Sequence, residues 1–201
     1  LLALADERDV AVIEDDIYAD AALAAVPDSL KSLDGDERVI VCSSFSKTLS
    51  RDLRLGWVVG GRWQSQIQRL KLVTQLASSR FVQQGVAEFI ADGSYTHHLR
   101  RLRSDLRQRR DQLASVLCRW PQAVRASMPE GGLSVWVELP EQVDTLDSYS
   151  RALAQGIVLT PGPLFSVSGQ FRHCLRLSFA HPWNGRRLDA LDALPEVLGM
   201  A

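Results

Sequence analysis

Apolar positions follow one pattern in the first half of the chain and another in the second. In the first half, short continuous apolar runs predict three strands, at 10–15, 38–42 and 55–59. Continuous runs, unlike alternating ones, are typical of a sheet that helices cover on both faces. Two longer segments, 62–77 and 81–92, predict helices. We therefore expect an α/β arrangement in this part of the chain.

A long amphipathic helix is predicted next, from about Tyr95 to Trp120. Its leucines recur at spacings of three, four and seven residues and form one apolar stripe, which consists of Leu99, Leu102, Leu106, Leu113 and Leu117. Beyond this helix, 132–139 and 173–179 alternate between apolar and polar residues, as half-buried strands do.

Two further helices are predicted in the second half, at 147–155 and 186–198. The change of pattern divides the chain into two domains. We predict an α/β domain over 1–94 and a smaller α+β domain over 95–201, which begins with the long helix.

Composition and charge exclude several classes of protein. The chain has 201 residues, of which 46% are hydrophobic and 23% charged, and its net charge is −1. These values are typical of a globular protein, and the charge provides no field that would attract nucleic acid or an acidic membrane. Neither a membrane-spanning run nor a secretory signal is visible.

The three cysteines, Cys42, Cys118 and Cys174, form no C-x-x-C pair and are odd in number, so neither a disulfide framework nor a zinc site is indicated. We expect a cytoplasmic protein that binds no metal. Because the sequence starts at Leu1, inside a predicted helix, we also expect it to be a piece of a longer chain.

Reactive side chains follow two of the predicted strands. Asp15 and Tyr18 come at the end of the first strand, and Ser44, Ser46 and Lys47 come at the end of the second. In open α/β sheets, ligands bind beyond the carboxyl ends of the strands. If these two strands are neighbours, a carboxylate, a phenol and an amine meet in one crevice.

These groups suit one cofactor. A lysine held against an apolar crevice loses hydration, which lowers its pKa and frees the amine to attack a carbonyl. A facing carboxylate could hold a protonated ring nitrogen, and a phenol could hydrogen-bond to a ring hydroxyl. Ser44, Ser46 and the guanidinium of Arg54 suit a phosphate. Together these partners describe pyridoxal phosphate.

The same residues carry a family resemblance. Asp15-x-x-Tyr18, Ser44-Phe45-Ser46-Lys47 and Arg54 resemble the signature of the fold type I, PLP-dependent aminotransferases of class I/II. The resemblance continues through EGGLSVWVELP, TPGPLF and CLRLSF and so covers essentially the whole chain. SSFSKTL and FRHCLRLSFAHPW look most like the aminotransferase-like domain of MocR-type regulators of the GntR family, which join it to a DNA-binding winged helix.

The resemblance implies the PLP-dependent transferase fold, with part of the large domain and its mostly parallel sheet in 1–94 and a small α+β domain in 95–201. Lys47 would form the Schiff base with the cofactor and move the substrate proton, and Asp15 would keep the pyridine nitrogen protonated. The remaining cofactor contacts would come from Tyr18, Ser44, Ser46 and Arg54. Arg176 would bind the α-carboxylate of an amino acid.

The resemblance also implies a homodimer with active sites at its interface, an amino acid or amine as ligand, and DNA contact only through an N-terminal winged helix. Two features depart from the family pattern: Arg51-Asp52 stands where Pro-Gly is usual, and the upstream half of the large domain is not in the sequence. The alternative function is a free-standing aminotransferase that acts on an α-amino acid and a 2-oxo acid.

Plainer interpretations of single residues stay open. Lys47 could be a solvated lysine, Tyr18 a core tyrosine and Arg176 a solvent-facing strand residue, although their joint spacing favours the cofactor and ligand roles. Ser44 to Lys47 also fits the S-x-x-K motif of penicillin-binding enzymes, but the partner motifs S-D-N and K-T-G are missing. Asp16 is expected to serve as a turn or cap residue. The six arginines between Arg100 and Arg110 predict a solvated helix face.

Overall fold

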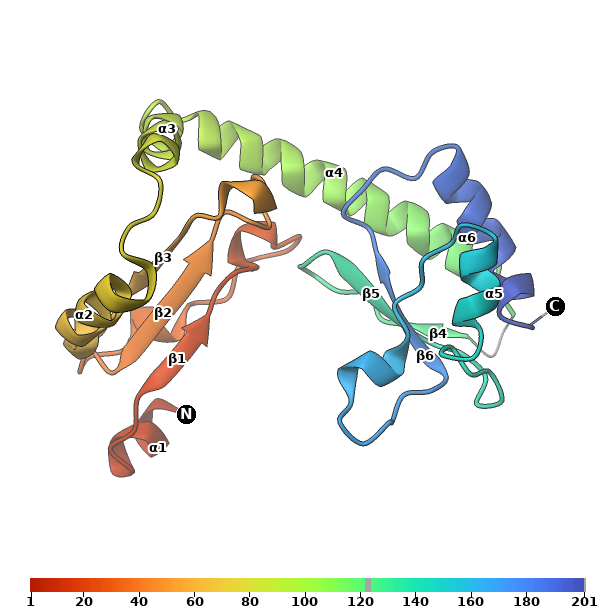
Figure 1. The fold of residues 1–201 in the computed structure, drawn as a ribbon, viewed down its shortest axis with the longest axis horizontal. Helices are drawn as coiled ribbons and strands as arrows, with labels where there is room; N and C mark the ends of the chain where they lie inside the picture. The colour runs from red at the N-terminus through yellow and green to blue at the C-terminus, as the bar shows by residue number, and fades with distance from the viewer. Residues whose placement is uncertain (122–123, 201) are drawn as a thin grey trace. The chain divides into compact units, whose positions relative to one another are not determined.

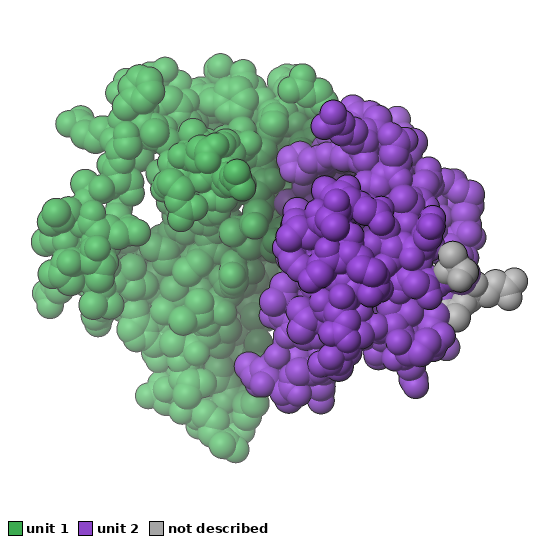
Figure 2. Space-filling model, turned by 45° about the vertical axis from the view of Figure 1, so that its right-hand side comes forward, with its two compact units in different colours: residues 1–103 green, residues 104–201 purple. Residues whose placement is uncertain are grey.

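A computed structural model describes residues 1–121 and 124–200 of the chain. The chain forms two compact units, Leu1–Arg103 and Ser104–Ala201, which Figure 2 colours green and purple. The long helix α4, Ser94–Leu117, runs from the first unit into the second. The domain boundary that the sequence suggests, between residues 94 and 95, stays a prediction.

The first unit holds a three-stranded sheet and its helices (Figure 1). Its strands are β1 (Val12–Asp15), β2 (Val39–Ser44) and β3 (Gly56–Val59). Its other elements are α1 (Leu2–Glu7), α2 (Gln64–Gln75), α3 (Arg80–Ala91), the start of α4, and the short 3₁₀ turns η1 (Ala19–Ala21), η2 (Leu30–Leu33), η3 (Arg51–Leu53) and η4 (Gly61–Trp63).

The strand order is β1-β2-β3, with β1 parallel to β2 and β3 antiparallel to β2. In this register Asp15 pairs with Cys42, and Ser44 pairs with Gly56. The carboxyl ends of β1 and β2 therefore meet at one edge of the sheet, and the chain enters β3 at that same edge. The two strands are neighbours, which is the condition on which the sequence argument for one crevice depended.

The expected cover on both faces of the sheet is only partly found. Val39 and Val41 of β2 are buried, but Ile13 of β1 is 71% exposed, and Trp57 and Val59 of β3 are also exposed. A continuous apolar run indicates that both faces of a strand need cover, but it does not say which part of a protein supplies it. The described residues bury mainly the central strand.

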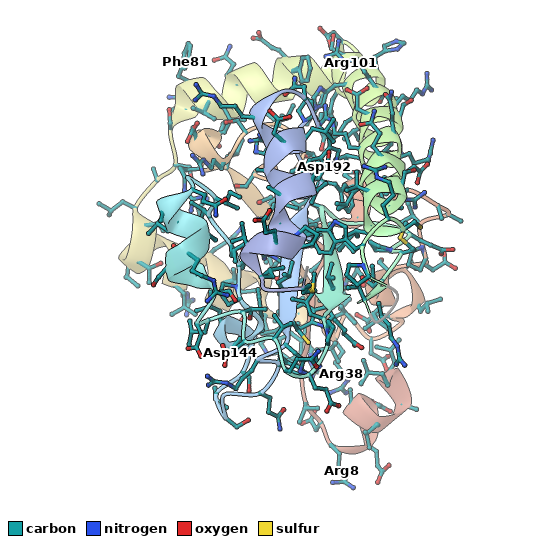
Figure 3. The ribbon with its side chains drawn as sticks, turned by 90° about the vertical axis from the view of Figure 1, so that its right-hand side faces the viewer. Arg8, Arg38, Phe81, Arg101, Asp144 and Asp192 are labelled. Carbon is teal, nitrogen blue, oxygen red and sulfur yellow. The ribbon has the colours of Figure 1, made fainter. Side chains whose placement is uncertain are left out.

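Ion pairs and hydrogen bonds fix the start of β2. The carboxylate of Asp34 accepts hydrogen bonds from the Val39 amide at 2.7 Å and from Lys31 Nζ at 3.2 Å. Arg38, labelled in Figure 3, has a buried side chain that donates to Asp6 at 2.9 Å and to Asp9 at 3.0 Å. These contacts hold β2 at the end opposite to Lys47.

The second unit is built on an antiparallel sheet of order β4-β5-β6. Its elements are the end of α4, β4 (Arg125–Ala126), β5 (Ser134–Glu138), α5 (Tyr149–Ala154), the 3₁₀ turn η5 (Gly162–Phe165), β6 (Cys174–Ser178) and α6 (Arg186–Val197). Helices α5 and α6 lie side by side (Figure 1). Its core contains Leu106, Leu113, Val135, Val137, Leu175 and Phe179, each at most 1% exposed.

The predicted strands and helices are all present, with ends that differ by a few residues. The sequence did not predict the two-residue strand β4 or the 3₁₀ turns, because such short elements have no periodic pattern. Within the described residues, no helix has both the length and the apolar character that crossing a bilayer requires.

Asp34 leads to a prediction about pH. Burial raises the pKa of Asp34, but hydrogen bonds from the Val39 and Arg38 amides and from Lys31 outweigh it and lower the pKa from 3.8 to about 2. A carboxyl with a lowered folded-state pKa stabilises the fold above its unfolded pKa, and this stabilisation disappears as the pH falls through the folded value. We expect Asp34→Asn to destabilise the protein at neutral pH, and the difference from wild type to shrink between about pH 4 and pH 2.

Urea unfolding at a series of pH values measures this difference. The matched control is Asp36→Asn, two residues along the chain and exposed, whose side chain makes none of these hydrogen bonds. An Asp34→Asn deficit that stayed constant over the acid range would contradict the assignment.

Candidate active site

The candidate site lies where β1 and β2 end. Asp15 is the last residue of β1, and the next amide, that of Asp16, donates to the Cys42 carbonyl at 2.8 Å. Asp15 Oδ1 also accepts a 3.3 Å hydrogen bond from the Ile17 amide, which bends the chain away from the sheet toward Tyr18. Asp15 thus lies at the strand end, as the sequence predicted, and it is exposed.

Lys47 sits in a tight turn directly after β2. This turn, residues 45–49, is closed by a 2.8 Å hydrogen bond from the Leu49 amide to the Phe45 carbonyl, and we call it the Lys47 turn. The Lys47 amine lies 5.6 Å from the centre of the Tyr18 ring. The structure therefore brings together the lysine and the phenol that the sequence selected.

The apolar crevice expected around Lys47 is not formed by the described residues. The Lys47 side chain is exposed, and the Tyr18 ring is 44% exposed. The sequence argument assumed that the strand ends would be enclosed, but β1 and β2 carry too few apolar side chains at this edge to enclose an amine.

Ser44 precedes the Lys47 turn, Ser46 lies within it, and Arg54 follows it. The Ser46 amide donates to Ser44 Oγ at 3.2 Å, and the Phe45 amide donates to the Leu55 carbonyl at 3.1 Å, which brings the chain beside Arg54 back to the strand end. No hydrogen bond joins Arg54 to the two serines in the described part of the chain. Its side chain lines a hollow of about 620 Å³ that also involves Trp57 of β3 and Lys71 of α2.

The backbone around Arg54 has two unusual features. Arg54 itself has φ 47° and ψ 38°, the left-handed conformation, which non-glycine residues seldom adopt and which recurs at functional sites. Gly56, two residues later, has no room for a side chain, because a Cβ atom would lie 2.6 Å from the Ser43 carbonyl oxygen. The approach of β3 to the serine end of β2 therefore requires glycine.

Residues that the sequence did not predict support the Lys47 turn from within the first unit. Tyr95 OH donates to Asp20 Oδ2 at 2.7 Å and lies 3.0 Å from Thr48 Oγ1. His98 Nε2 lies 2.5 Å from the Thr48 carbonyl oxygen, and Arg103 Nε donates to the Asp20 carbonyl at 2.9 Å. No sequence signal could have found this set, because Thr48 and Tyr95 are far apart along the chain.

Electrostatics at the strand end favour a positive charge. The pKa of Asp16 is raised by burial, and then by the negative charges of Glu14, Asp20 and Asp15. The carboxylates that follow β1 therefore repel one another, and a cationic group bound among them would be stabilised. Within the described residues, no cluster of His, Cys, Asp or Glu suits a metal ion.

Arg176 belongs to the second unit. It lies on β6 directly opposite Trp136 of β5, and its guanidinium is 5.3 Å from the centre of the Phe165 ring. Phe165 and Phe171 both pack edge-on against Trp136, with ring centres 5.5 Å and 5.6 Å away. Arg176 is thus an exposed guanidinium in an aromatic neighbourhood.

Gly162 keeps this aromatic group together. A Cβ atom at Gly162 would lie 2.1 Å from the Phe171 carbonyl oxygen and 2.8 Å from that of Cys174. The turn η5 can therefore pass close to the chain before β6 only with glycine, and this close approach brings Phe165 to Arg176. Close packing of the backbone therefore explains why the TPGPLF motif has glycine at this position.

The sequence predicted a solvated face for the arginines of α4, but several of them contact backbone carbonyls instead. In the first unit, Arg103 binds the Asp20 carbonyl. In the second unit, Arg109 donates to the Ala180 carbonyl at 2.7 Å and Arg110 to the Pro129 carbonyl at 3.0 Å. Arginines on a helix face can reach loop carbonyls that only the fold brings near, so that Arg103, Arg109 and Arg110 have structural roles.

The fold places the chain in a known protein family. Residues 1–194 match the family model described as "Aminotransferase class I and II". The chain belongs to this family, and its fold is that of the fold type I PLP-dependent aminotransferases.

Among its relatives, the uncharacterized HTH-type transcriptional regulator YjiR of Escherichia coli is 34% identical over 98% of this chain and 43% of its own length. Aromatic-amino-acid aminotransferase 1 of Thermococcus litoralis is 27% identical over 98% of this chain and 48% of its own. The kynurenine aminotransferase of Pyrococcus horikoshii, solved with PMP, superposes with a TM-score of 0.87 at 30% identity, over 98% of this chain and 50% of its own. The chain thus spans about half the length of the relatives it matches.

Proposed function

We propose that the edge formed by β1 and β2 binds pyridoxal phosphate through Lys47. One observation carries the proposal: the Lys47 amine takes part in no ion pair among the described residues. It lies 5.6 Å from the centre of the Tyr18 ring, in the turn after β2, which pairs in parallel with the strand that ends in Asp15. The two other lysines of the chain, Lys31 and Lys71, lie elsewhere, and Lys31 is bound to Asp34. Lys47 is therefore the lysine whose amine, at the end of β2, is available to react with the cofactor.

The residues present fit the cofactor in their chemistry. The hydroxyls of Ser44 and Ser46 and the guanidinium of Arg54, which forms no ion pair with the described residues, supply donors for a phosphate. Burial, and then the negative charges of its carboxylate neighbours, raise the pKa of Asp16, and the negative charge gathered at this strand end favours a protonated ring nitrogen near Asp15. Tyr18 supplies a phenol within reach of the lysine.

When bound, pyridoxal phosphate supplies an aldehyde that reacts with amines and a ring that withdraws electrons. Asp15 keeps the ring nitrogen protonated, Tyr18 donates to the ring hydroxyl, and Ser44, Ser46 and Arg54 hold the phosphate. Lys47 Nζ would take up and return the substrate proton. Arg176, which forms no ion pair with any residue that the structure describes, binds the carboxylate of an α-amino acid.

For the whole protein we propose a MocR-type regulator of the GntR family, in which this aminotransferase-like part senses an amino acid or amine. The similarity to YjiR supports this proposal, and the similarity to the aromatic-amino-acid aminotransferase supports the alternative, a free-standing aminotransferase. We also propose a homodimer, and α2 carries exposed apolar side chains that a second copy could cover, such as Leu70 and Val73.

Covalent labelling tests the cofactor proposal. Borohydride treatment of the intact protein with pyridoxal phosphate should attach a pyridoxyl group to Lys47 alone among the three lysines, as peptide mapping by mass spectrometry would reveal. Lys47→Ala should abolish the label, and the control Lys71→Ala should retain it. A label that stays after Lys47→Ala would refute the assignment.

Replacing Arg176 tests the ligand proposal. Arg176→Ala removes charge-assisted hydrogen bonds to a carboxylate, and we expect amino-acid affinity to fall about ten- to a hundredfold while cofactor affinity is unchanged. Calorimetric titration of the cofactor-loaded protein measures the amino-acid affinity, and titration of the cofactor-free protein with pyridoxal phosphate measures the cofactor affinity. The control is Arg101→Ala, an exposed arginine of α4; equal loss in both variants would contradict a specific role for Arg176.

The reading frame of the full protein separates the regulator from the enzyme. We expect a winged helix with a basic recognition helix upstream of the aminotransferase-like part, and DNA affinity of the full protein that falls steeply with salt. An upstream segment that contains only the remaining half of an aminotransferase would identify a free-standing enzyme instead.

A further inference from the structure

Thr48, the residue that follows Lys47, is anchored at two points. Its side chain is buried, with 3% of the residue exposed, although its neighbour Lys47 is exposed. Its hydroxyl lies 3.0 Å from Tyr95 OH, and its carbonyl oxygen lies 2.5 Å from His98 Nε2. The Lys47 turn is therefore attached to the first turns of α4 by both a side-chain and a backbone contact.

The protons of this group have only one consistent arrangement. A tyrosine hydroxyl has a single proton, and that of Tyr95 is donated to the Asp20 carboxylate at 2.7 Å. The 3.0 Å contact to Thr48 must then use the Thr48 proton, with Tyr95 OH as acceptor. The chain of hydrogen bonds runs from Thr48 to Tyr95 to Asp20, and we call these three residues the tyrosine brace.

The tyrosine brace connects the two segments that carry the candidate cofactor residues. Asp20 lies two residues after Tyr18, and Thr48 lies one residue after Lys47. Arg103 holds Asp20 from the other side, with its Nε on the Asp20 carbonyl at 2.9 Å and a guanidinium nitrogen 3.6 Å from the carboxylate. Phe45 packs edge-on against the Tyr95 ring, with the ring centres 5.7 Å apart, at the start of the Lys47 turn.

We propose that Tyr95 is a positioning residue that, through Thr48 and Asp20, holds Lys47 at its distance from Tyr18 and so prepares the site for the cofactor. The proposal rests on the proposed function of Lys47. A lysine on an exposed turn loses much conformational freedom when it is fixed by a covalent bond, and a turn fixed in advance lowers that cost. Tyr95 acts on the cofactor only through the turn, so it is not itself a catalytic residue.

Three variants test the brace in the full protein. Tyr95→Phe keeps the ring packed on Phe45 but removes the hydroxyl, Thr48→Val removes the donor with little change in shape, and Thr48→Ser restores it. The control is Tyr149→Phe in α5, where no hydrogen bond of the described residues involves the hydroxyl. Each variant is measured by the dissociation constant of pyridoxal phosphate, the induced circular dichroism of the bound cofactor, and urea unfolding without cofactor.

We expect Tyr95→Phe and Thr48→Val to weaken cofactor binding about five- to thirtyfold and to reduce the induced circular dichroism. Thr48→Ser and Tyr149→Phe should stay close to wild type. Because the two hydroxyls act as one unit, the double variant should bind no more weakly than the worse single variant. Additive losses, or cofactor affinity and dichroism unchanged in Tyr95→Phe, would overturn the proposal.

Labelling of Lys47 separates this outcome from failure of the proposed function. If borohydride places the pyridoxyl group on Lys47 in both wild type and Tyr95→Phe with equal affinity, the site is correct and the brace is wrong. If wild type takes no label at Lys47, the proposed function itself fails. A loss of unfolding stability without any change in the bound-cofactor spectrum would make the brace purely structural and would likewise refute the proposal.

Discussion

The parallel pairing of β1 with β2 is the constraint on which the candidate site depends. The register that pairs Asp15 with Cys42 places the end of β1 beside the last residues of β2, so that an acidic segment and the Lys47 turn begin at the same edge. A shift of one residue would reverse the faces of all side chains on one strand. The contacts of Asp34 and Arg38 at the start of β2 fix this register at the opposite end from the reactive amine.

Cations of this chain fall into two groups according to their partners. Arg38 and Lys31 are paired with carboxylates and hold the first unit together, and Arg109 and Arg110 bind loop carbonyls in the second unit. Lys47, Arg54 and Arg176 form no ion pair in the described part of the chain. An unpaired cation that is held in place by backbone geometry or by an aromatic ring is ready for an anionic or carbonyl ligand, which is the physical basis of the proposed site.

Residues outside the candidate binding set hold the candidate reactive residues in place. In the first unit, Tyr95 fastens the Lys47 turn to the Tyr18 segment through Thr48 and Asp20. In the second unit, Gly162 allows the η5 turn to approach the chain before β6, so that Phe165 reaches Arg176. Both units therefore hold an exposed cation by means of buried or tightly packed neighbours, a common way of limiting the entropy lost on binding.

The sequence by itself predicted the main strands and helices and the candidate reactive residues. Apolar periodicity predicted the strands and helices to within a few residues, because burial of an apolar face is a local property of spacing. The spacing of Asp15, Tyr18, Ser44, Ser46, Lys47 and Arg54 predicted a cofactor site, because those residue types leave few alternative ligands.

Only the tertiary structure decided how these residues are held. The contact between Thr48 and Tyr95, the arginines on loop carbonyls and the ring of Phe165 beside Arg176 all join residues that are distant along the chain. Such contacts depend on strand order and on the path of loops, which leave no periodic pattern. The exposure of Lys47 was likewise not predictable, since the enclosure of a strand end depends on what packs there and not on the strand's own residues.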